Sequence, residues 1–223
     1  MTKYDLSFIF EDEIEKGICP KCRKNKTEVD FFTGEDILCT DCRKLINKEI
    51  GYDTLKQNAN VPKAYYIYSW RNYDENFFKK IVEATNRFKN NLHLVGGSFT
   101  GKTVLMIACI DYLIKYGENS ILFYNVPELL TNAQKESYSY YNYLINKCSH
   151  IRFLFLDDIF NGLNSSENKF LYEILDYRNR NNLPTVSSTN VKINDARIYS
   201  RLLRNNGVEI EINSKFWRKA NER

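Results

Sequence analysis

The sequence lacks the features that mark membrane and secreted proteins. No apolar run in its 223 residues approaches the roughly 18 residues that a membrane-spanning helix needs. The N-terminal stretch is acidic and does not have the basic-then-apolar layout of a secretory signal peptide. Internal repeats and low-complexity tracts are also missing. We therefore expect a globular, cytoplasmic protein with no membrane partner.

The chain also lacks a strong excess of charge of one sign. It has 32 basic and 28 acidic residues, for a net charge of +4. This mild basic balance permits contact with nucleic acid but does not argue for it. A hydrophobic content of 43% is ordinary for a globular protein, and the length suffices for one good core and a small appendage.

Disulfides are not expected in a cytoplasmic protein, so the six cysteines need another explanation. Four of them follow the pattern C-x₂-C-x₁₆-C-x₂-C, which is typical of a structural zinc site. Four thiolates leave no open coordination position, so this Zn²⁺ would have no catalytic role. A redox pair or unrelated thiols are the alternatives. The candidate ligands are Cys19, Cys22, Cys39 and Cys42.

The order of these features predicts two units. Residues 1–50 would form the zinc module, with a hairpin turning near Gly34 between the cysteine pairs. Such a unit is too small to bury a core, so the metal must supply much of its folding free energy. Residues 51–60 are polar and are interpreted as a linker, and residues 61–223 would form the second unit.

In the second unit, apolar strands alternate with helices. This order favours an α/β fold, with a parallel sheet covered by helices on both faces. We expect strands at 92–95, 120–124, 151–156, 184–189 and 207–212, and helices at 74–90, 102–116, 126–148, 165–180, 195–204 and the C-terminus.

The segment GGSFTGKT fits the phosphate-binding pattern G-x-x-x-x-G-K-[ST]. Backbone N–H groups of such a loop cradle the phosphates of ATP or ADP, the lysine approaches the outer phosphates, and the threonine hydroxyl can ligate Mg²⁺. The pattern also occurs by chance, but an apolar strand before it and a helix after it favour a true site. The loop residues are Gly96, Gly97, Ser98, Phe99, Thr100, Gly101, Lys102 and Thr103.

Polar residues that follow two other strands complete the predicted site. Asp157 ends the apolar segment FLFL and is suited to hold Mg²⁺ through water, and Asp158 is suited to orient or deprotonate the attacking water. Asn190 follows the strand that ends in SST and is expected to face the γ-phosphate. The alternatives are two aspartates that only cap a strand and an ordinary turn asparagine.

Two arginines lie four residues apart on the helix that follows. Arg197 and Arg201 therefore share a helix face. From this helix an arginine would reach the nucleotide of a neighbouring subunit more easily than that of its own chain. The alternative is a solvated basic face.

Taken in order, GGSFTGKT, FLFLDD, SSTN and ARIYSRL resemble an AAA+ ATPase. The resemblance is to the replicative-helicase loaders DnaC and DnaI of bacteria and phages, with the IstB transposition helpers as relatives. The segment VPKAYYIYSW followed by NLHLVG adds to it, and the likeness covers roughly residues 61–218. A cysteine-rich module ahead of this region fits the loaders better than IstB.

The resemblance implies a role for each matching residue. Lys102 and Thr103 become the Walker A pair, and Asp157 and Asp158 become the Walker B pair. Asn190 becomes sensor 1. The remaining assignments are Arg201 as the arginine finger, with Arg197 as runner-up, and Arg218 as the C-terminal sensor arginine.

The tyrosine-rich stretch 126–148 lies where this branch carries a helical insertion that faces DNA. Its tyrosines could stack on bases or pack on the sheet.

Two positions depart from the family pattern. Phe99 stands where the loop usually has glycine, which adopts a positive φ at little cost, so strain or weaker nucleotide binding is expected. Asp158 stands where many relatives have glutamate, so we expect slow hydrolysis.

Three functions fit this sequence. The first is a loader that binds a DnaB-type hexameric helicase through its zinc module, assembles into a ring or spiral, and uses ATP to place the helicase on single-stranded DNA. The second is an IstB-type transposition helper that binds and bends duplex DNA. The third is a nucleotide-responsive adaptor or inhibitor with little turnover.

Overall fold

The computed structural model describes residues 19, 21–24, 38–135, 137–204 and 206–213. The leader, the hairpin expected near Gly34 and the expected C-terminal helix lie outside these residues. Within the described part of the chain, no helix combines the length and apolarity that crossing a membrane would require.

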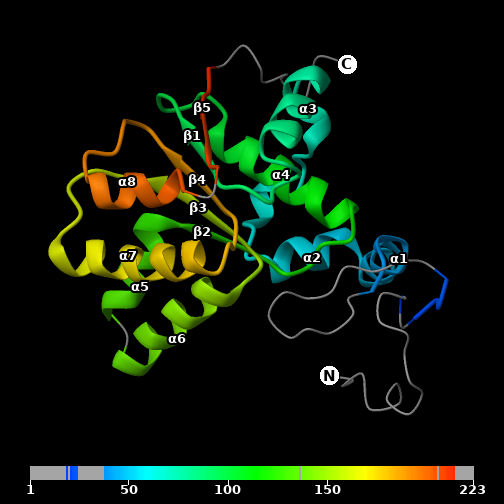
Figure 1. The fold of residues 1–223 in the computed structure, drawn as a ribbon, viewed down its shortest axis with the longest axis horizontal. Helices are drawn as coiled ribbons and strands as arrows, with labels where there is room; N and C mark the ends of the chain where they lie inside the picture. Colours follow the sequence, from blue (N-terminus) through cyan, green and yellow to red (C-terminus); the bar gives the residue numbers. More distant parts are fainter. Residues whose placement is uncertain (1–18, 20, 25–37, 136, 205, 214–223) are drawn as a thin grey trace.

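A five-stranded sheet forms the centre of the molecule (Figure 1), and its strands run in the order β2-β3-β4-β1-β5. Every neighbouring pair is parallel, which confirms the predicted α/β class. Strand β4 lies between β1 and β3, an order that the sequence alone did not reveal. The strands are β1 (Leu92–Val95), β2 (Ile121–Asn125), β3 (Phe153–Ile159), β4 (Thr185–Thr189) and β5 (Val208–Glu211).

Helices cover both faces of this sheet (Figure 1). Side chains alternate along a strand, so Phe155 points into one hydrophobic core and Leu156 into the other. The first core lies under α2 (Tyr52–Asn58), α3 (Glu75–Ala84) and α4 (Lys102–Lys115). The second lies under α5 (Val126–Lys135), α6 (Tyr138–His150), α7 (Ser165–Arg180) and α8 (Ala196–Leu202).

Residues 51–60 are not the polar linker that we expected. Most of them form α2, whose Leu55 is buried in the first core together with Ala59 just beyond the helix. Lys56 is also buried, and its ammonium donates hydrogen bonds to the carbonyls of Tyr66 and Tyr68 and pairs with Asp111. A buried lysine needs such partners, and all three lie at least ten residues away in the sequence.

Three other elements differ from their predicted bounds by more than two residues. Helix α3 ends at Ala84 instead of continuing to residue 90, because the chain turns through three left-handed residues at 86–88. The stretch 126–148 contains two helices, and the Ser137 side chain caps the second by accepting a hydrogen bond from the Tyr140 amide. Strand β3 continues past residue 156 to Ile159. Short 3₁₀ turns lie at η2 (Lys63–Tyr65) and η3 (Trp70–Asn72).

The cysteine-bearing end of the chain packs against the far end of α4. Helix α1 (Thr40–Ile50) is joined to α2 at Gly51, whose φ of 90° favours glycine. Asn47 donates hydrogen bonds to the carbonyls of Ile114 and Glu118, and Arg43 forms an ion pair with Glu118 at 2.7 Å. Helix α1 is therefore docked on the end of α4 through specific polar contacts.

Candidate nucleotide site and metal centre

The phosphate-binding loop joins the carboxyl end of β1 to the N-terminus of α4. Gly96 has to be glycine, because a Cβ atom there would lie 2.3 Å from the Ile212 carbonyl oxygen. Gly101 precedes the helix with a φ of 95°, a second position that favours glycine. The backbone N–H groups at the start of α4 carry no helical acceptor, so they can serve an anion.

Lys102 is held at the centre of this loop. Its ammonium donates hydrogen bonds to the carbonyls of Gly96 and Gly97, at 2.6 and 2.8 Å, and to the Asn190 side-chain oxygen at 2.8 Å. Burial lowers the pKa of Lys102, while the charges of Asp157 and Asp158 act in the opposite direction. The ammonium is thus held by the loop and by Asn190, within reach of the charges of both aspartates.

The two aspartates lie beside the loop, as the sequence predicted. The Thr103 hydroxyl donates to one oxygen of Asp157 at 2.8 Å, and the Asn190 amide donates to Asp158 at 2.7 Å. Burial raises the pKa of the Asp157 carboxyl, and hydrogen bonds from Ser188 and Thr103 oppose this rise. A hydroxyl beside a buried carboxylate is a donor set that suits Mg²⁺, which prefers oxygen ligands.

These residues line a cavity of about 380 Å³. That volume lies within the range of small-molecule sites, which runs from about 300 to 1,000 Å³. The loop and the ends of β3 and β4 form most of its wall, and Tyr65 and Asn125 complete it. The arrangement offers a phosphate cradle, a cation for outer phosphates and a place for a magnesium ion.

Three supporting residues escaped the sequence analysis. Tyr73 is buried and donates a hydrogen bond to the Gly101 carbonyl, which fixes the end of the loop. Tyr65 lines the cavity, and Ser188 contacts both aspartates. A tyrosine before the first strand and a serine within a buried strand carry no local pattern that marks them as site residues.

Phe99 occupies the tip of the loop in a left-handed conformation, with a φ of 61°. This backbone is rare for a bulky residue with a Cβ atom, so the structure agrees with the strain expected there. The side chain is 97% exposed and contributes no packing that would compensate.

The two arginines of α8 differ in how they are held. Arg201 stacks on the Tyr172 ring at 3.9 Å and pairs with Asp176 at 3.0 Å, and only 14% of its side chain is exposed. The side chain of Arg197 is 72% exposed and contacts Asp195 at 3.4 Å. Arg197 also lines a separate hollow of about 460 Å³ between α7 and α8. Neither arginine lines the cavity of its own chain, and Arg218 lies outside the described residues.

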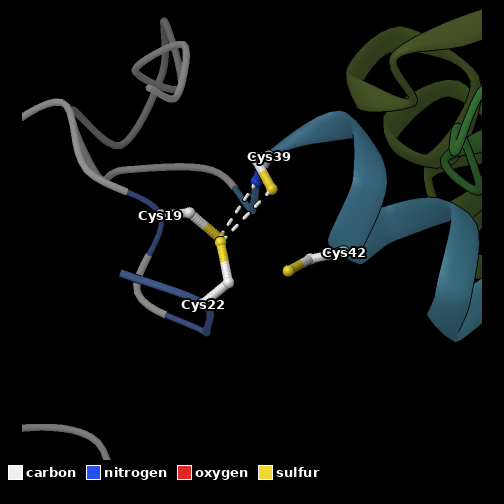
Figure 2. Close-up of side chains that lie close together, drawn as sticks. All are labelled: Cys19, Cys22, Cys39 and Cys42. Atoms are coloured by element: carbon white, nitrogen blue, oxygen red, sulfur yellow. Dashed lines mark hydrogen bonds between the residues drawn. The ribbon is translucent and has the colours of Figure 1, made fainter. Parts of the chain in front are cut away.

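The four cysteines converge on one point, as Figure 2 shows. Cys19 and Cys22 come from a turn, whereas Cys39 and Cys42 lie at the start of α1. All four sulfur atoms lie within 4.8 Å of one another, and the Cys22 and Cys39 sulfurs are 3.7 Å apart. A zinc ion with four sulfurs at about 2.3 Å has sulfur–sulfur edges of about 3.8 Å. The cluster therefore fits a structural Zn²⁺.

The surroundings of the thiols also fit metal ligation. Burial opposes ionisation of Cys19, but hydrogen bonds from backbone N–H groups, including those of Cys22 and Cys39, outweigh it and lower its pKa to about 6. Burial and the neighbouring thiols raise the pKa of Cys42 to about 12. Four close thiols cannot all ionise without a cation between them, and a bound metal would supply that cation.

No protein-family model matches the sequence, and no curated protein matches it. Solved structures do. DnaI matches with a TM-score of 0.56 and 26% identity over 69% of this chain and 94% of its own. The DnaC helicase loader matches with a TM-score of 0.51 and 18% identity, over 68% of this chain and all of its own. AMPPCP-bound DnaA from Aquifex aeolicus matches with a TM-score of 0.52 and 19% identity, over 65% of this chain and 50% of its own.

Proposed function

We propose that this chain, which has the fold of the AAA+ replication ATPases, is an ATP-dependent helicase loader. It binds a DnaB-type hexameric replicative helicase and helps to place that helicase on single-stranded DNA. The observation that carries the proposal is the contact of Lys102 with Asn190 and of Thr103 with Asp157, within a fold that matches DnaI over 94% of the DnaI chain. Apart from Arg218, the residues that would act on the nucleotide lie in the described part of the protein.

The proposed nucleotide chemistry follows from the contacts in the cavity. Lys102 neutralises the outer phosphates of ATP, and Thr103 and Asp157 would hold Mg²⁺, which supplies charge neutralisation at the β- and γ-phosphates. Asp158 is positioned by Asn190 at 2.7 Å and would orient the attacking water. Because Asp158 has a shorter side chain than the usual glutamate, we expect slow turnover.

A nucleotide-responsive adaptor with little turnover is a second candidate. The left-handed conformation of Phe99 favours this adaptor role, because strain in the phosphate-binding loop would lower the affinity for nucleotide. The transposition-helper alternative has no particular support from the described contacts.

We further propose that α6 faces single-stranded DNA. Tyr138 and Tyr143 are 80% and 52% exposed, and Lys147 lies over the Tyr143 ring. Exposed aromatic rings beside a cation suit stacking on bases. Tyr140 and Tyr141 pack against the second core instead, so the two roles expected for these tyrosines are divided among different side chains.

The proposed nucleotide site is tested by Lys102→Ala. The variant keeps the backbone cradle but loses the cation, so ATP affinity measured by calorimetry should fall about 10- to 100-fold, the size of a lost charge-assisted hydrogen bond. Lys115→Ala, at the opposite end of the same helix, is the matched control and should bind ATP as the wild type does. Equal ATP affinity of the Lys102 variant and the wild type would refute the site.

The proposed partner is tested separately by co-elution with a DnaB-type hexamer. The full chain should form a stable complex with the helicase in the presence of ATP and should increase helicase loading on circular single-stranded DNA. A chain that binds ATP but neither co-elutes with the hexamer nor changes its loading would exclude the loader role and leave the nucleotide site intact.

A further inference from the structure

Ser188 contacts both aspartates of the nucleotide site through a single hydroxyl group. It donates a hydrogen bond to Asp157 Oδ1 at 2.5 Å and accepts one from the backbone N–H of Asp158 at 2.9 Å. Its exposed fraction is 0%, and its bond to Asp157 is fully buried. A single hydroxyl oxygen on β4 therefore contacts both aspartates at the end of β3.

The second of these bonds compensates for a break in the sheet. The regular register between β3 and β4 shifts between Leu156 and Ile159, and Asp158 adopts a left-handed φ of 60°. The shift leaves the Asp158 N–H without its regular partner in the sheet, and a backbone N–H in this part-buried position requires an acceptor. The Ser188 hydroxyl supplies it and so holds the backbone that directs the Asp158 side chain toward Asn190.

The first bond completes the fixation of the other carboxylate. Thr103 donates to Asp157 Oδ2, and Ser188 donates to Asp157 Oδ1. Each oxygen thus receives one hydrogen bond and keeps lone pairs directed elsewhere. The carboxylate plane is fixed from two sides, by α4 and by β4.

We propose that Ser188 is a positioning residue of the nucleotide site, which sets the Asp157 carboxylate for Mg²⁺ and the Asp158 backbone for the attacking water. The inference rests on the proposed ATPase function and deepens it. It assigns the serine a role in the magnesium-dependent step, whereas a residue that only fills the core would affect stability and nothing else.

The chain offers a matched control one residue away. Ser187 is equally buried, but it faces the opposite side of β4, where its hydroxyl pairs with His93 Nδ1 at 2.8 Å. Burial lowers the pKa of His93 to about 4, so this pair does not titrate in an assay near neutral pH. Ser187→Ala therefore removes the same atom from the same strand without touching the aspartates.

The test compares nucleotide affinity in EDTA with affinity in Mg²⁺, using a fluorescent ATP analogue. Ser188→Ala should bind as the wild type does in EDTA, because Lys102 and the loop are unchanged. The increase in nucleotide affinity on going from EDTA to Mg²⁺ should be about 10- to 100-fold smaller in this variant than in the wild type. This is the usual effect of removing a residue that hydrogen-bonds to a metal ligand. The half-saturating Mg²⁺ concentration should rise accordingly, and the Asp158 amide should exchange its hydrogen faster.

Two further variants keep the inference falsifiable if the alanine variant does not fold. Ser188→Thr and Ser188→Val introduce side chains of the same branched shape, but only threonine keeps the hydroxyl. The threonine variant should retain the Mg²⁺-dependent gain, and the valine variant should lose it. Wild-type Mg²⁺ dependence in the alanine or valine variant would overturn the inference, and so would an equal loss in Ser187→Ala. If the wild type binds no nucleotide, the proposed function fails first, and the inference fails with it.

Discussion

The nucleotide site and the cysteine cluster are both compact groups of polar side chains, but they are held in place by different means. The site side chains project from strands and a helix whose apolar residues fill two large cores. The hydrophobic cluster around the cysteines is small: among the described residues it consists of the four cysteines and Leu38. The packed cores thus hold the side chains of the nucleotide site in place, whereas the zinc ion that we infer would itself stabilise the fold around the cysteines.

The two regions meet through α4 at its opposite ends. The phosphate-binding loop precedes Lys102, whereas α1 docks beside Ile114 and Glu118. A helix of 14 residues is about 21 Å long, so α4 separates the phosphate-binding loop from the place where α1 docks. Loss of the metal should therefore damage the first unit and leave the second largely intact.

Removal of one zinc ligand should have a larger effect than any other single substitution. We expect Cys22→Ser to abolish the one zinc ion per chain that elemental analysis should find in the wild type. Structural zinc binding is worth about 10–16 kcal/mol in small metal-dependent units. Hydrogen exchange at the start of α1 should accelerate strongly, while ATP affinity should stay near that of the wild type.

The matched control for this change is Cys148→Ser. Cys148 is a residue of α6 that is buried in the second core and lies outside the cluster, so its variant should keep the zinc ion. Wild-type protein that contains no zinc after purification without chelators would contradict the metal assignment. A Cys22 variant that loses ATP binding would show that the two regions are coupled through α4.

The α8 arginines and the cysteine cluster differ in whether their own chain supplies every residue of the site. All four ligands of the cluster come from one chain, whereas neither Arg197 nor Arg201 lines the nucleotide cavity of its own chain. We propose that an α8 arginine completes the site of a neighbouring subunit. The family resemblance implies Arg201, but its contacts with Asp176 and Tyr172 would have to be exchanged, so the contacts favour Arg197.

Alanine variants distinguish the two arginines. Arg197→Ala should keep its melting temperature and ATP binding but lose the hydrolysis stimulated by assembly. Arginine fingers elsewhere contribute about 10³- to 10⁵-fold in rate, and a slow ATPase will show less. Arg201→Ala should lower the free energy of unfolding by about 2 kcal/mol, because the variant loses the charge-assisted hydrogen bonds of this side chain. Its melting temperature should therefore fall by about 4–8 °C.

A mixing experiment tests the action between subunits. Arg197→Ala subunits keep a good phosphate loop, and Lys102→Ala subunits keep a good arginine, so their mixture should regain part of the stimulated activity. Full activity of the Arg197 variant, together with an inactive but thermally stable Arg201 variant, would assign the role to Arg201. No recovery at any ratio, with assembly confirmed by light scattering, would count against action between subunits.

The parts of this fold that sequence could predict are those with local causes. The loop from Gly96 to Thr103 has a fixed spacing between a strand and a helix, and the four cysteines have a fixed spacing of their own. The apolar segment before Asp157 identified β3, and the segment PTVSST before Asn190 identified β4. Each of these patterns spans fewer than about twenty-five residues, so no tertiary contact was needed to recognise it.

The parts that were missed depend on distant partners. The polar sequence of α2 suggested a linker because the carbonyls that satisfy Lys56, and its ion pair with Asp111, belong to other elements. Ser188 could not be identified before the register shift in β3 was known. The contacts of Arg201 depend on how α7 and α8 pack, which the spacing of the two arginines does not reveal.

The smallest expected effect concerns Phe99. Unlike the buried residues of the nucleotide site, Phe99 is not held in place by packing against the rest of the fold. A left-handed conformation costs a residue with a Cβ atom about 1–2 kcal/mol, and the 97% exposed ring packs on nothing that would offset this cost. Glycine has no such penalty, although its greater freedom in the unfolded chain costs about 0.4–1 kcal/mol. Phe99→Gly should therefore raise the free energy of unfolding by about 1 kcal/mol or less, which corresponds to a rise of up to about 4 °C in melting temperature. It should also bind ATP a few-fold more tightly.

Phe99→Ala is the matched control, because it removes the ring but keeps the Cβ atom and the strained backbone. This variant should gain neither stability nor ATP affinity. If the two variants improve ATP binding equally, the ring itself obstructs the nucleotide and backbone strain is not the cause.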